Sequence, residues 1–271
     1  MPDTRHPIQP RYAFIFLLLA VTCLGTNFVG QMFFPGLNTF PIAVRALLSG
    51  LGLLALGLGS EWLLARQFHG EITLGLTPSA KSLAGLLVGS VGGVIIVAGM
   101  AVGLWFFSPF HFDHGTATFR QILPDVQNYF LGNSGEELVF RGYLLIILAR
   151  RFGLNVALLF IAGIFGLFHL PGLNGYAALK MCLTTASLSY LFAAAFLASG
   201  TIWAAVALHF VSNVVLHKIT GLDNGVALLH PVMENQQEHS YDPAFWICLI
   251  LPLAVAYPLF SLRFPTRLKI A

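Results

Sequence analysis

Residues Leu83 to Phe107 read LAGLLVGSVGGVIIVAGMAVGLWFF, a stretch of 25 positions without a charged side chain. A helix of about 20 such residues is long enough to cross the hydrocarbon core of a bilayer. The whole chain has the same character, because 57% of its 271 residues are hydrophobic and only 9% are charged, against about a quarter in soluble domains. So much apolar surface can be accommodated in a membrane but not in a soluble fold of this length.

Seven further segments are apolar enough to be interpreted as membrane spans. We therefore predict an all-α fold, a polytopic transmembrane helix bundle of about eight spans, in a single integral membrane domain over residues 1–271. Arg5 and Arg11 precede the first span, which is longer than the ~7–15 residues of a signal-peptide core, so we expect it to be retained. With the stretch quoted above, the predicted spans are Tyr12–Phe34, Pro41–Leu64, Leu83–Phe107, Val126–Leu148, Val156–Leu170, Ala177–Ala198, Ile202–His217 and Phe245–Leu262.

The distribution of Lys and Arg orients the predicted bundle, since cytoplasmic loops are enriched in these residues. If both termini are cytoplasmic, only Arg120, Lys180 and Lys218 of the 14 basic residues fall outside, and Arg45 and Arg141 lie within spans. We therefore predict a multi-pass protein of a bacterial inner membrane with both termini in the cytoplasm. The nine basic residues expected inside are Arg5, Arg11, Arg66, Lys81, Arg150, Arg151, Arg263, Arg267 and Lys269.

Charge and cysteine content exclude other classes of partner and site. The formal net charge of +3 is too small and too scattered to indicate a nucleic-acid partner. Cys23, Cys182 and Cys248 lie far apart inside apolar runs without a C-x-x-C pair. We interpret them as buried free thiols rather than as a disulfide, a metal site or a nucleophile.

Polar residues within the predicted spans are densest between Asn133 and Tyr143, which read NSGEELVFRGY. A charged side chain at the centre of a span costs ~2.5–3.5 kcal/mol on insertion scales, so its retention needs a reason. Glu137 and Arg141 are four residues apart with the glutamate first, which is the favourable order for a helical ion pair. Glu136 points about 100° away and stays available for chemistry. On this cluster alone, a set of charges that only locks helices together is an equal alternative.

Two later spans carry further polar groups. His169 ends the fifth span, and His209 and Asn213 lie four residues apart on one face of the seventh. A single histidine in an apolar span is most often a hydrogen-bonded packing residue. Four polar groups on three spans are harder to explain in this way, because each is costly in hydrocarbon. We expect Glu136, His169, His209 and Asn213 to line one interior cavity.

These residue types match the needs of amide hydrolysis. A buried glutamate beside a histidine can activate water and protonate the leaving amine, and a second histidine with an asparagine amide can stabilise the oxyanion. Histidine and glutamate are also zinc ligands, so zinc is the alternative. The chain has no H-E-x-x-H motif, and asparagine is an uncommon zinc ligand, so we predict neither a metal nor another cofactor.

The ordered motifs resemble those of the CAAX-protease and bacteriocin-processing family, whose eukaryotic members trim prenylated proteins after the CAAX cysteine. The resemblance rests on Glu136-Glu137-x-x-x-Arg141, Phe165-x-x-x-His169 and His209-x-x-x-Asn213, and covers roughly residues 121–217, the predicted catalytic core. It implies that Glu136 and His169 activate water, that His209 and Asn213 form the oxyanion hole, that Glu137 and Arg141 support the first motif helix, and that Phe165 packs behind the site.

The predicted function is therefore a glutamate-type intramembrane endopeptidase that acts on a membrane-embedded or lipid-anchored protein or peptide. One alternative is a non-catalytic membrane scaffold or bacteriocin-immunity-type protein on the same fold. Another is a small transporter whose Glu and His residues carry protons. The transporter predicts repeated halves, and the sequence shows no internal repeat.

Some polar residues outside the motifs are given structural roles. His217 continues the stripe of His209 and Asn213, and we interpret it as an interfacial histidine at a helix end, with the mouth of the site as the alternative. Arg45 is interpreted as structural, and Asp125 and Asn128 either pair inside the bundle or line an access path. Solvated loop positions are expected for His111, His114, His230 and His239, and for the long polar loop His217–Asp242.

The orientation can be tested with a reporter that is active only in the cytoplasm. With cytoplasmic termini, all four candidate catalytic groups fall in the outer half of the bilayer. A fusion after Asn224 is therefore expected to be inactive, and a control fusion after Arg151 to be active. Activity after Asn224 would overturn both the orientation and an outward-opening site.

Overall fold

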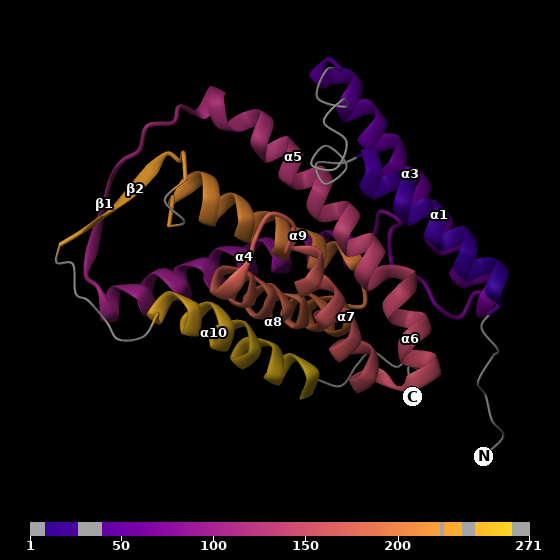
Figure 1. Cartoon of the computed structure of the whole chain (residues 1–271). Helices are drawn as coiled ribbons and strands as arrows, with labels where there is room; N and C mark the ends of the chain where they lie inside the picture. The colour runs from indigo at the N-terminus through magenta and orange to yellow at the C-terminus, as the bar shows by residue number, and fades with distance from the viewer. Residues whose placement is uncertain (1–8, 27–39, 223–224, 235–241, 262–271) are drawn as a thin grey trace.

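The computed structural model describes residues 9–26, 40–222, 225–234 and 242–261, and the described part is almost entirely helical (Figure 1). It contains α-helices, two π-helical segments (η2 and η3) and one pair of strands. The helices are α1 (Pro10–Thr26), α3 (Ile42–Gln67), α4 (Ala80–Phe107), α5 (Phe119–Glu137), η2 (Leu138–Leu144), α6 (Leu145–Phe152), α7 (Leu154–Phe168), α8 (Gly175–Ser199), α9 (Ile202–Val214), η3 (Val215–Ile219) and α10 (Pro243–Ser261); the strands are β1 (Phe110–His114) and β2 (Leu229–Met233).

Several of these helices have the length and composition of membrane spans, which confirms the predicted all-α polytopic membrane fold. Two shorter apolar helices, Pro10–Gly25 and Leu154–Phe168, correspond to the first and fifth predicted spans. Residues 27–34 of the first predicted span lie outside the described residues, and the total of eight spans stays a prediction. The five helices of sufficient length are Ala43–Gln67, Ala80–Phe107, Gly175–Ser199, Ile202–Ile219 and Pro243–Phe260.

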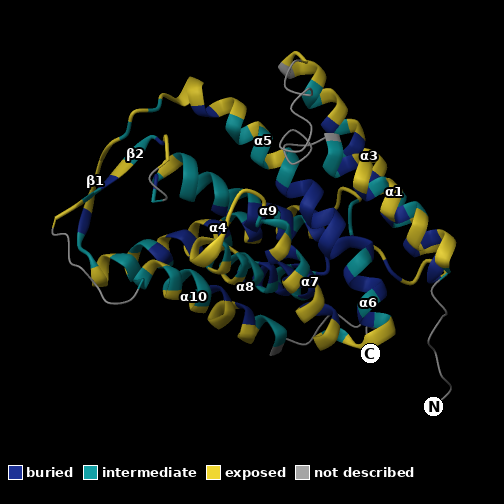
Figure 2. Ribbon diagram, viewed as in Figure 1, coloured by how far each residue is buried: buried dark blue, intermediate teal, exposed yellow. Residues whose placement is uncertain are grey.

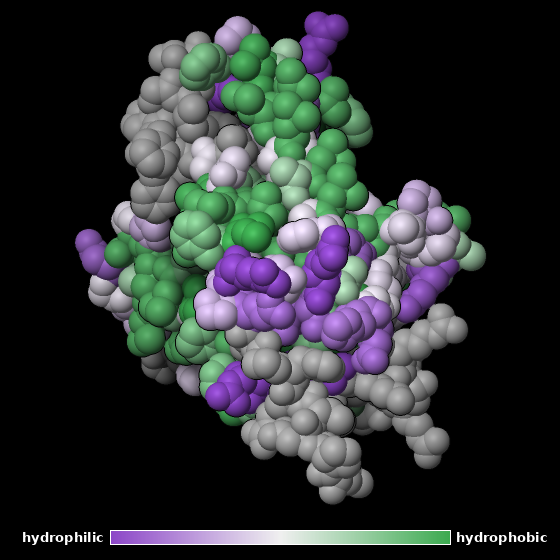
Figure 3. Space-filling view, turned by 90° about the vertical axis from the view of Figure 1, so that its right-hand side faces the viewer, coloured by the Kyte–Doolittle hydropathy of each residue, from purple (hydrophilic) through white to green (hydrophobic). Residues whose placement is uncertain are grey.

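The surface also has the character of a membrane protein. Large apolar side chains such as Leu87, Val88 and Phe106 are at least 60% exposed, as expected of residues that face lipid. Figure 3 shows apolar side chains over the upper part of the face turned away from the sheet, with hydrophilic side chains gathered below them. Buried residues concentrate where the end of α5 meets the inner helices (Figure 2).

The fourth predicted span differs most from the structure. Helical structure runs from Phe119 to Phe152, through α5, η2 and α6, with a kink at Gly142, and so begins seven residues before the predicted Val126. The early start is stabilised by the Gln121 side chain, whose Oε1 accepts from both the backbone N–H and the hydroxyl of the N-cap residue Thr118, each over 2.8 Å. Glu136 lies near the middle of this path, 17 residues after Phe119 and 16 before Phe152, rather than towards one end.

The π-helical segment η2 follows Glu137 directly, and the backbone departs from helical geometry at Gly142, where φ is −72° and ψ is −122°. A second π-helical segment, η3, begins two residues after Asn213. Such segments are rare in proteins and occur frequently at functional sites. Both motif helices, α5 and α9, therefore change their geometry immediately after their polar residues.

The small antiparallel sheet was not predicted. Strand β1 pairs with β2 in the register Phe110↔Met233 to His114↔Leu229, and Figure 1 shows the pair extending away from the bundle. The expectation of loops at His111, His114 and His230 is wrong, because all three lie in strands, but their expected exposure is confirmed. The predicted polar loop His217–Asp242 likewise contains the end of η3 and all of β2, while His239 lies outside the described residues.

One ion pair connects the starts of two spans. Lys180 on α8 donates to Asp242 over 2.6 Å, and Asp242 also accepts from the Phe245 backbone N–H at the start of α10. The hydrogen bond from Lys180 holds the pKa of the Asp242 carboxyl below its usual range. This contact fixes α10 beside α8 at the edge of the bundle.

Glycines allow α4 to approach α9 closely. Gly85, Gly89 and Gly93 repeat every four residues on α4 and face α9. A Cβ atom on Gly89 would overlap the Ala204 carbonyl oxygen and lie 2.9 Å from the Ala207 Cβ. Small residues at such spacing let membrane helices pack backbone to backbone, and here they position the helix that carries His209.

Replacement of Gly89 by Ala should therefore loosen the α4–α9 interface, by about 1–3 kcal/mol as for other overpacked sites. The matched control is Gly163→Ala on α7, where a new Cβ would meet nothing within 4 Å. Thermal unfolding in detergent, followed by fluorescence-detected size exclusion, should show a lower midpoint for Gly89→Ala only. Equal midpoints would mean that the close approach contributes little to stability.

Candidate active site

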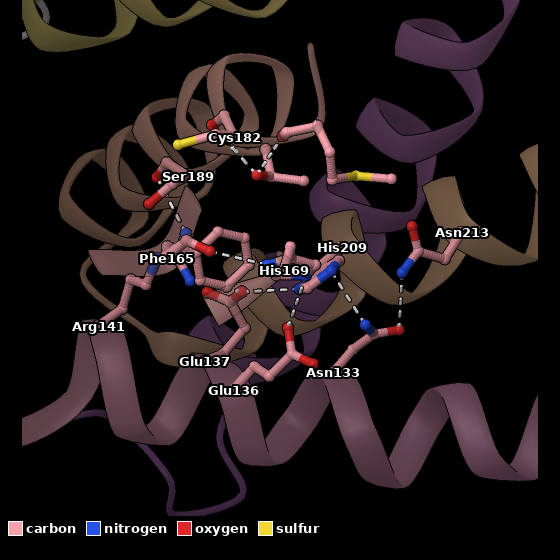
Figure 4. Close-up of polar contacts among 12 residues, drawn as sticks. Asn133, Glu136, Glu137, Arg141, Phe165, His169, Cys182, Ser189, His209 and Asn213 are labelled. Carbon is pink, nitrogen blue, oxygen red and sulfur yellow. Dashed lines mark hydrogen bonds and ion pairs between the residues drawn. The ribbon is translucent and has the colours of Figure 1, made fainter. Parts of the chain in front are cut away.

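The polar residues singled out in the sequence come together in the interior of the bundle (Figure 4). Glu136 and Glu137 end α5, His169 follows α7, and His209 and Asn213 lie on α9. Glu136 and His209 are buried, with 8% and 4% of their surface exposed, and His169 and Asn213 are partly buried. Three elements that are distant in sequence thus contribute to one polar cluster.

The ion pair predicted within the first motif is present. Arg141 donates from Nη1 to Glu137 Oε1 over 3.1 Å, and both side chains are fully buried. The other terminal nitrogen of Arg141 donates to the Ser189 carbonyl oxygen on α8, also over 3.1 Å. The guanidinium carbon lies 4.3 Å from the centre of the Phe165 ring. A buried cation needs such partners, because its desolvation is otherwise uncompensated.

Glu137 has a second contact that sequence reasoning missed. Its Oε1 accepts a hydrogen bond of 2.8 Å from His209 Nδ1, so the ring proton is on Nδ1. The Phe192 ring stacks on the His209 imidazole at a centroid distance of 4.3 Å. Glu137 therefore orients His209 as well as pairing with Arg141. This link joins residues 72 positions apart, which no local spacing in the sequence reveals.

Glu136 is placed differently from Glu137. Its Oε2 lies 3.9 Å from His169 Nε2, and this buried oxygen has no hydrogen-bond partner in the described part of the chain. His169 donates from Nδ1 to the Phe165 carbonyl oxygen over 2.7 Å, which turns the Nε2 lone pair towards Glu136. A separation of 3.9 Å is too long for a direct hydrogen bond but suits a bridging water.

Phe165 lies directly behind this pair. Its ring centre is 4.6 Å from that of His169 and 6.0 Å from that of His209. With its backbone carbonyl bonded to His169 Nδ1, Phe165 contacts both histidines and the Arg141 guanidinium. The Phe165 ring thereby fills the volume behind the two histidines, and its backbone carbonyl fixes the direction of the His169 ring.

Asn133, which was quoted with the first motif but given no role, belongs to the cluster. Its Nδ2 lies 2.9 Å from His209 Nε2, and its Oδ1 accepts from Asn213 Nδ2 over 3.4 Å. Asn133 is one helical turn before Glu137 and so shares its face of α5. That spacing was the available sequence signal for its place in the site.

Beyond Asn213, polar contacts between α5 and η3 continue towards the sheet. The rings of Tyr129 and His217 stack at a centroid distance of 5.7 Å, and Lys218 pairs with Asp125 over 2.8 Å. His217 therefore packs along α5. Asp125 is paired as one of its two alternatives proposed, but its side chain is 48% exposed rather than inside the bundle. Asn128 on α5 and Arg45 on α3 are partly buried.

The zinc alternative requires at least three ligand side chains grouped around one point. Within the ranges that the structure describes, no three His, Cys, Asp or Glu side chains are grouped so that they could hold a metal ion. Glu136 and His169 are two potential ligands, while His209 directs its nitrogens to Glu137 and Asn133.

Residues 118–215 match the family model described as type II CAAX prenyl endopeptidase, Rce1-like. The matched segment contains every residue of the three sequence motifs, which confirms the resemblance inferred from them. It extends from the capping residue of α5 to the first residue of η3. A comparison with curated proteins found no match.

The geometry predicts that Glu137→Gln lowers the yield of folded protein. The neutral amide leaves Arg141 buried without its counter-charge, and breaking such a pair costs ~3–5 kcal/mol. The control is Asp125→Asn, which removes a carboxylate that is 48% exposed and paired with Lys218, where a loss of ~0–1 kcal/mol is expected. Yields of monodisperse protein and unfolding midpoints give the comparison, and similar values for both variants would contradict a structural role for Glu137.

Proposed function

Because residues 118–215 match the Rce1-like family model, we propose that this membrane protein is a glutamate-type intramembrane endopeptidase. The substrate is a membrane-embedded or lipid-anchored protein or peptide. The observation that carries the proposal is the buried, unpartnered Oε2 of Glu136, 3.9 Å from the Nε2 lone pair of His169. Two acceptors at this spacing form a site for one water molecule, which each of them can polarise.

The first step is water activation. Glu136 takes one proton from the water while His169 Nε2 accepts a hydrogen bond from the other, and the oxygen attacks the carbonyl carbon of the peptide bond. The carbonyl oxygen becomes an oxyanion. Glu136 then gives its proton to the leaving nitrogen, the C–N bond breaks, and a carboxyl and an amine are released. Neither a serine nor a cysteine nucleophile takes part in this sequence.

Charge develops on the carbonyl oxygen during attack, and preorganised donors lower that barrier. Asn213 offers an amide N–H beyond its bond to Asn133. His209 donates from Nδ1 to Glu137 Oε1, and its Nε2 becomes a second donor when that nitrogen is protonated. We assign the oxyanion hole to these two α9 side chains, on the side of the cluster opposite Arg141.

The location and orientation follow from charge. We propose a bacterial inner membrane with both termini cytoplasmic. In Figure 1, α6 and the end of α3, which carry Arg150, Arg151 and Arg66, lie on the right, and the sheet lies on the left. This separation supports an inner end at α6 and an outer end at the sheet. The midway position of Glu136 on its helical path supports cleavage within the bilayer rather than at its surface.

The proposal predicts that Glu136→Gln abolishes peptide cleavage while leaving the protein folded, since the amide keeps the volume and removes the base. The probe is an internally quenched, S-farnesylated peptide that ends in Cys, two aliphatic residues and a final residue, incubated with the purified protein in lipid nanodiscs. Glu71→Gln, at an exposed position after α3, is the control and should cleave like the unsubstituted protein.

The outcomes separate the alternatives. Loss of cleavage in Glu136→Gln, with an unchanged unfolding midpoint, supports the protease. Full activity of this variant would contradict it. A second comparison examines the C-termini of membrane proteins in cells with and without this protein. If the unsubstituted protein does not cleave the probe and its deletion changes no C-terminus, the non-catalytic scaffold becomes the better explanation.

A further inference from the structure

Asn133 is a buried polar residue, 4% exposed, to which the three sequence motifs give no role. Figure 4 shows its side chain between those of His209 and Asn213, the two residues assigned to the oxyanion hole. Its Nδ2 is 2.9 Å from His209 Nε2 and its Oδ1 is 3.4 Å from Asn213 Nδ2. One amide group on α5 thus contacts both α9 residues at once.

The hydrogen bonds around Asn133 have a consistent direction. The Glu137 carboxylate accepts only, so His209 Nδ1 carries a proton and neutral His209 presents a lone pair at Nε2. Asn133 Nδ2 donates to that lone pair, and Asn133 Oδ1 in turn accepts from Asn213. The chain therefore runs from Asn213 through Asn133 and His209 to Glu137, whose charge is balanced by Arg141.

The reverse arrangement is also self-consistent. If the amides of Asn133 and Asn213 both turn by 180°, Asn133 Oδ1 faces His209 and accepts from a protonated Nε2, and Asn133 Nδ2 donates to Asn213 Oδ1. The amide of Asn133 is the group that discriminates between the two states, because the other face contacts of His209 are the Phe192 and Phe165 rings, at centroid distances of 4.3 and 6.0 Å. The other polar pair nearby is Glu136 with His169, and the Phe165 ring contacts both His169 and His209.

We infer that Asn133 is a positioning residue that sets the proton state and ring direction of His209 and aligns Asn213. The inference rests on the proposed function, since it assigns Asn133 to the same oxyanion hole. The side-chain hydrogen bonds of Asn133 in the described part of the chain go to His209 and Asn213. Its effect on the reaction passes through His209 and Asn213.

Two variants separate positioning from packing. Asn133→Leu keeps the volume and removes both hydrogen bonds. Asn133→Asp keeps the shape but can only accept, so it favours the arrangement in which His209 Nε2 is protonated. Gln127→Leu, at an exposed position on the same helix, is the matched control. A purely structural Asn133 would show altered yield in the first two variants without a specific change at His209.

The primary readout is the nitrogen-15 spectrum of histidine-labelled protein in nanodiscs without substrate, with the His209 signals identified from their loss in His209→Gln. In the unsubstituted protein we expect one protonated nitrogen and one hydrogen-bonded lone-pair nitrogen. Asn133→Asp should convert the second to a protonated nitrogen, and Asn133→Leu should shift it towards a non-bonded value. Gln127→Leu should leave both signals unchanged. Identical His209 signals in the unsubstituted protein, Asn133→Asp and Asn133→Leu would overturn the inference whatever the activity.

Cleavage of the farnesylated probe provides the second readout. Misplaced donors are expected to lower kcat in Asn133→Leu, on the order of 10²-fold for a displacement of about 1 Å, with KM within about twofold because ground-state binding is retained. An unchanged kcat in a folded Asn133→Leu would contradict the positioning role. If the unsubstituted protein shows the expected spectra but no cleavage, the hydrogen-bond chain stands and the proposed protease fails.

Discussion

A single buried carboxylate oxygen organises the interior of this protein. Glu137 Oε1 accepts from Arg141 over 3.1 Å and from His209 over 2.8 Å, in a place with no solvent exposure. A charge in such surroundings is tolerated only with well-placed partners. Because Arg141 also donates to the Ser189 carbonyl oxygen, the charge of Glu137 holds α5 with η2, α8 and α9 in one arrangement. The positions of the other polar residues in the cluster depend on this need of Glu137 for partners.

Adjacent carboxylates thereby acquire different surroundings. Each has a buried Oε2 without a hydrogen-bond partner in the described part of the chain. The other oxygen of Glu137 accepts from Arg141 and His209, whereas the Oε2 of Glu136 faces His169 Nε2 at 3.9 Å. Leaving a buried acceptor unsatisfied costs free energy, about 1–3 kcal/mol for an ordinary polar group. Such a cost is typical of sites that await water or substrate. The helical rotation of about 100° between consecutive residues is enough to separate the two functions.

The sequence predicted those parts of the molecule that depend on local periodicity. Apolar runs identified the long helices, and a spacing of four residues identified the pair of Glu137 with Arg141. It did not predict contacts that need the folded bundle. The bond of Glu137 to His209 joins positions 72 residues apart, and Asn133 becomes part of the site only through α9. The strands β1 and β2 are short and lie more than 100 residues apart, so neither carries a pattern that reveals its partner.

The glycine face of α4 limits whether the three motifs would be active in another helix bundle. Gly85, Gly89 and Gly93 lie outside residues 118–215, yet they contact the backbone of the helix that carries His209 and Asn213. Residues 118–215 are therefore not sufficient to build the site alone, because the position of α9 also depends on α4, a helix that carries none of the motifs. Grafting the three motifs onto another bundle would transfer the reactive groups but not their alignment. A bundle that receives the motifs would also need a neighbouring helix with glycine at the positions that correspond to Gly85, Gly89 and Gly93.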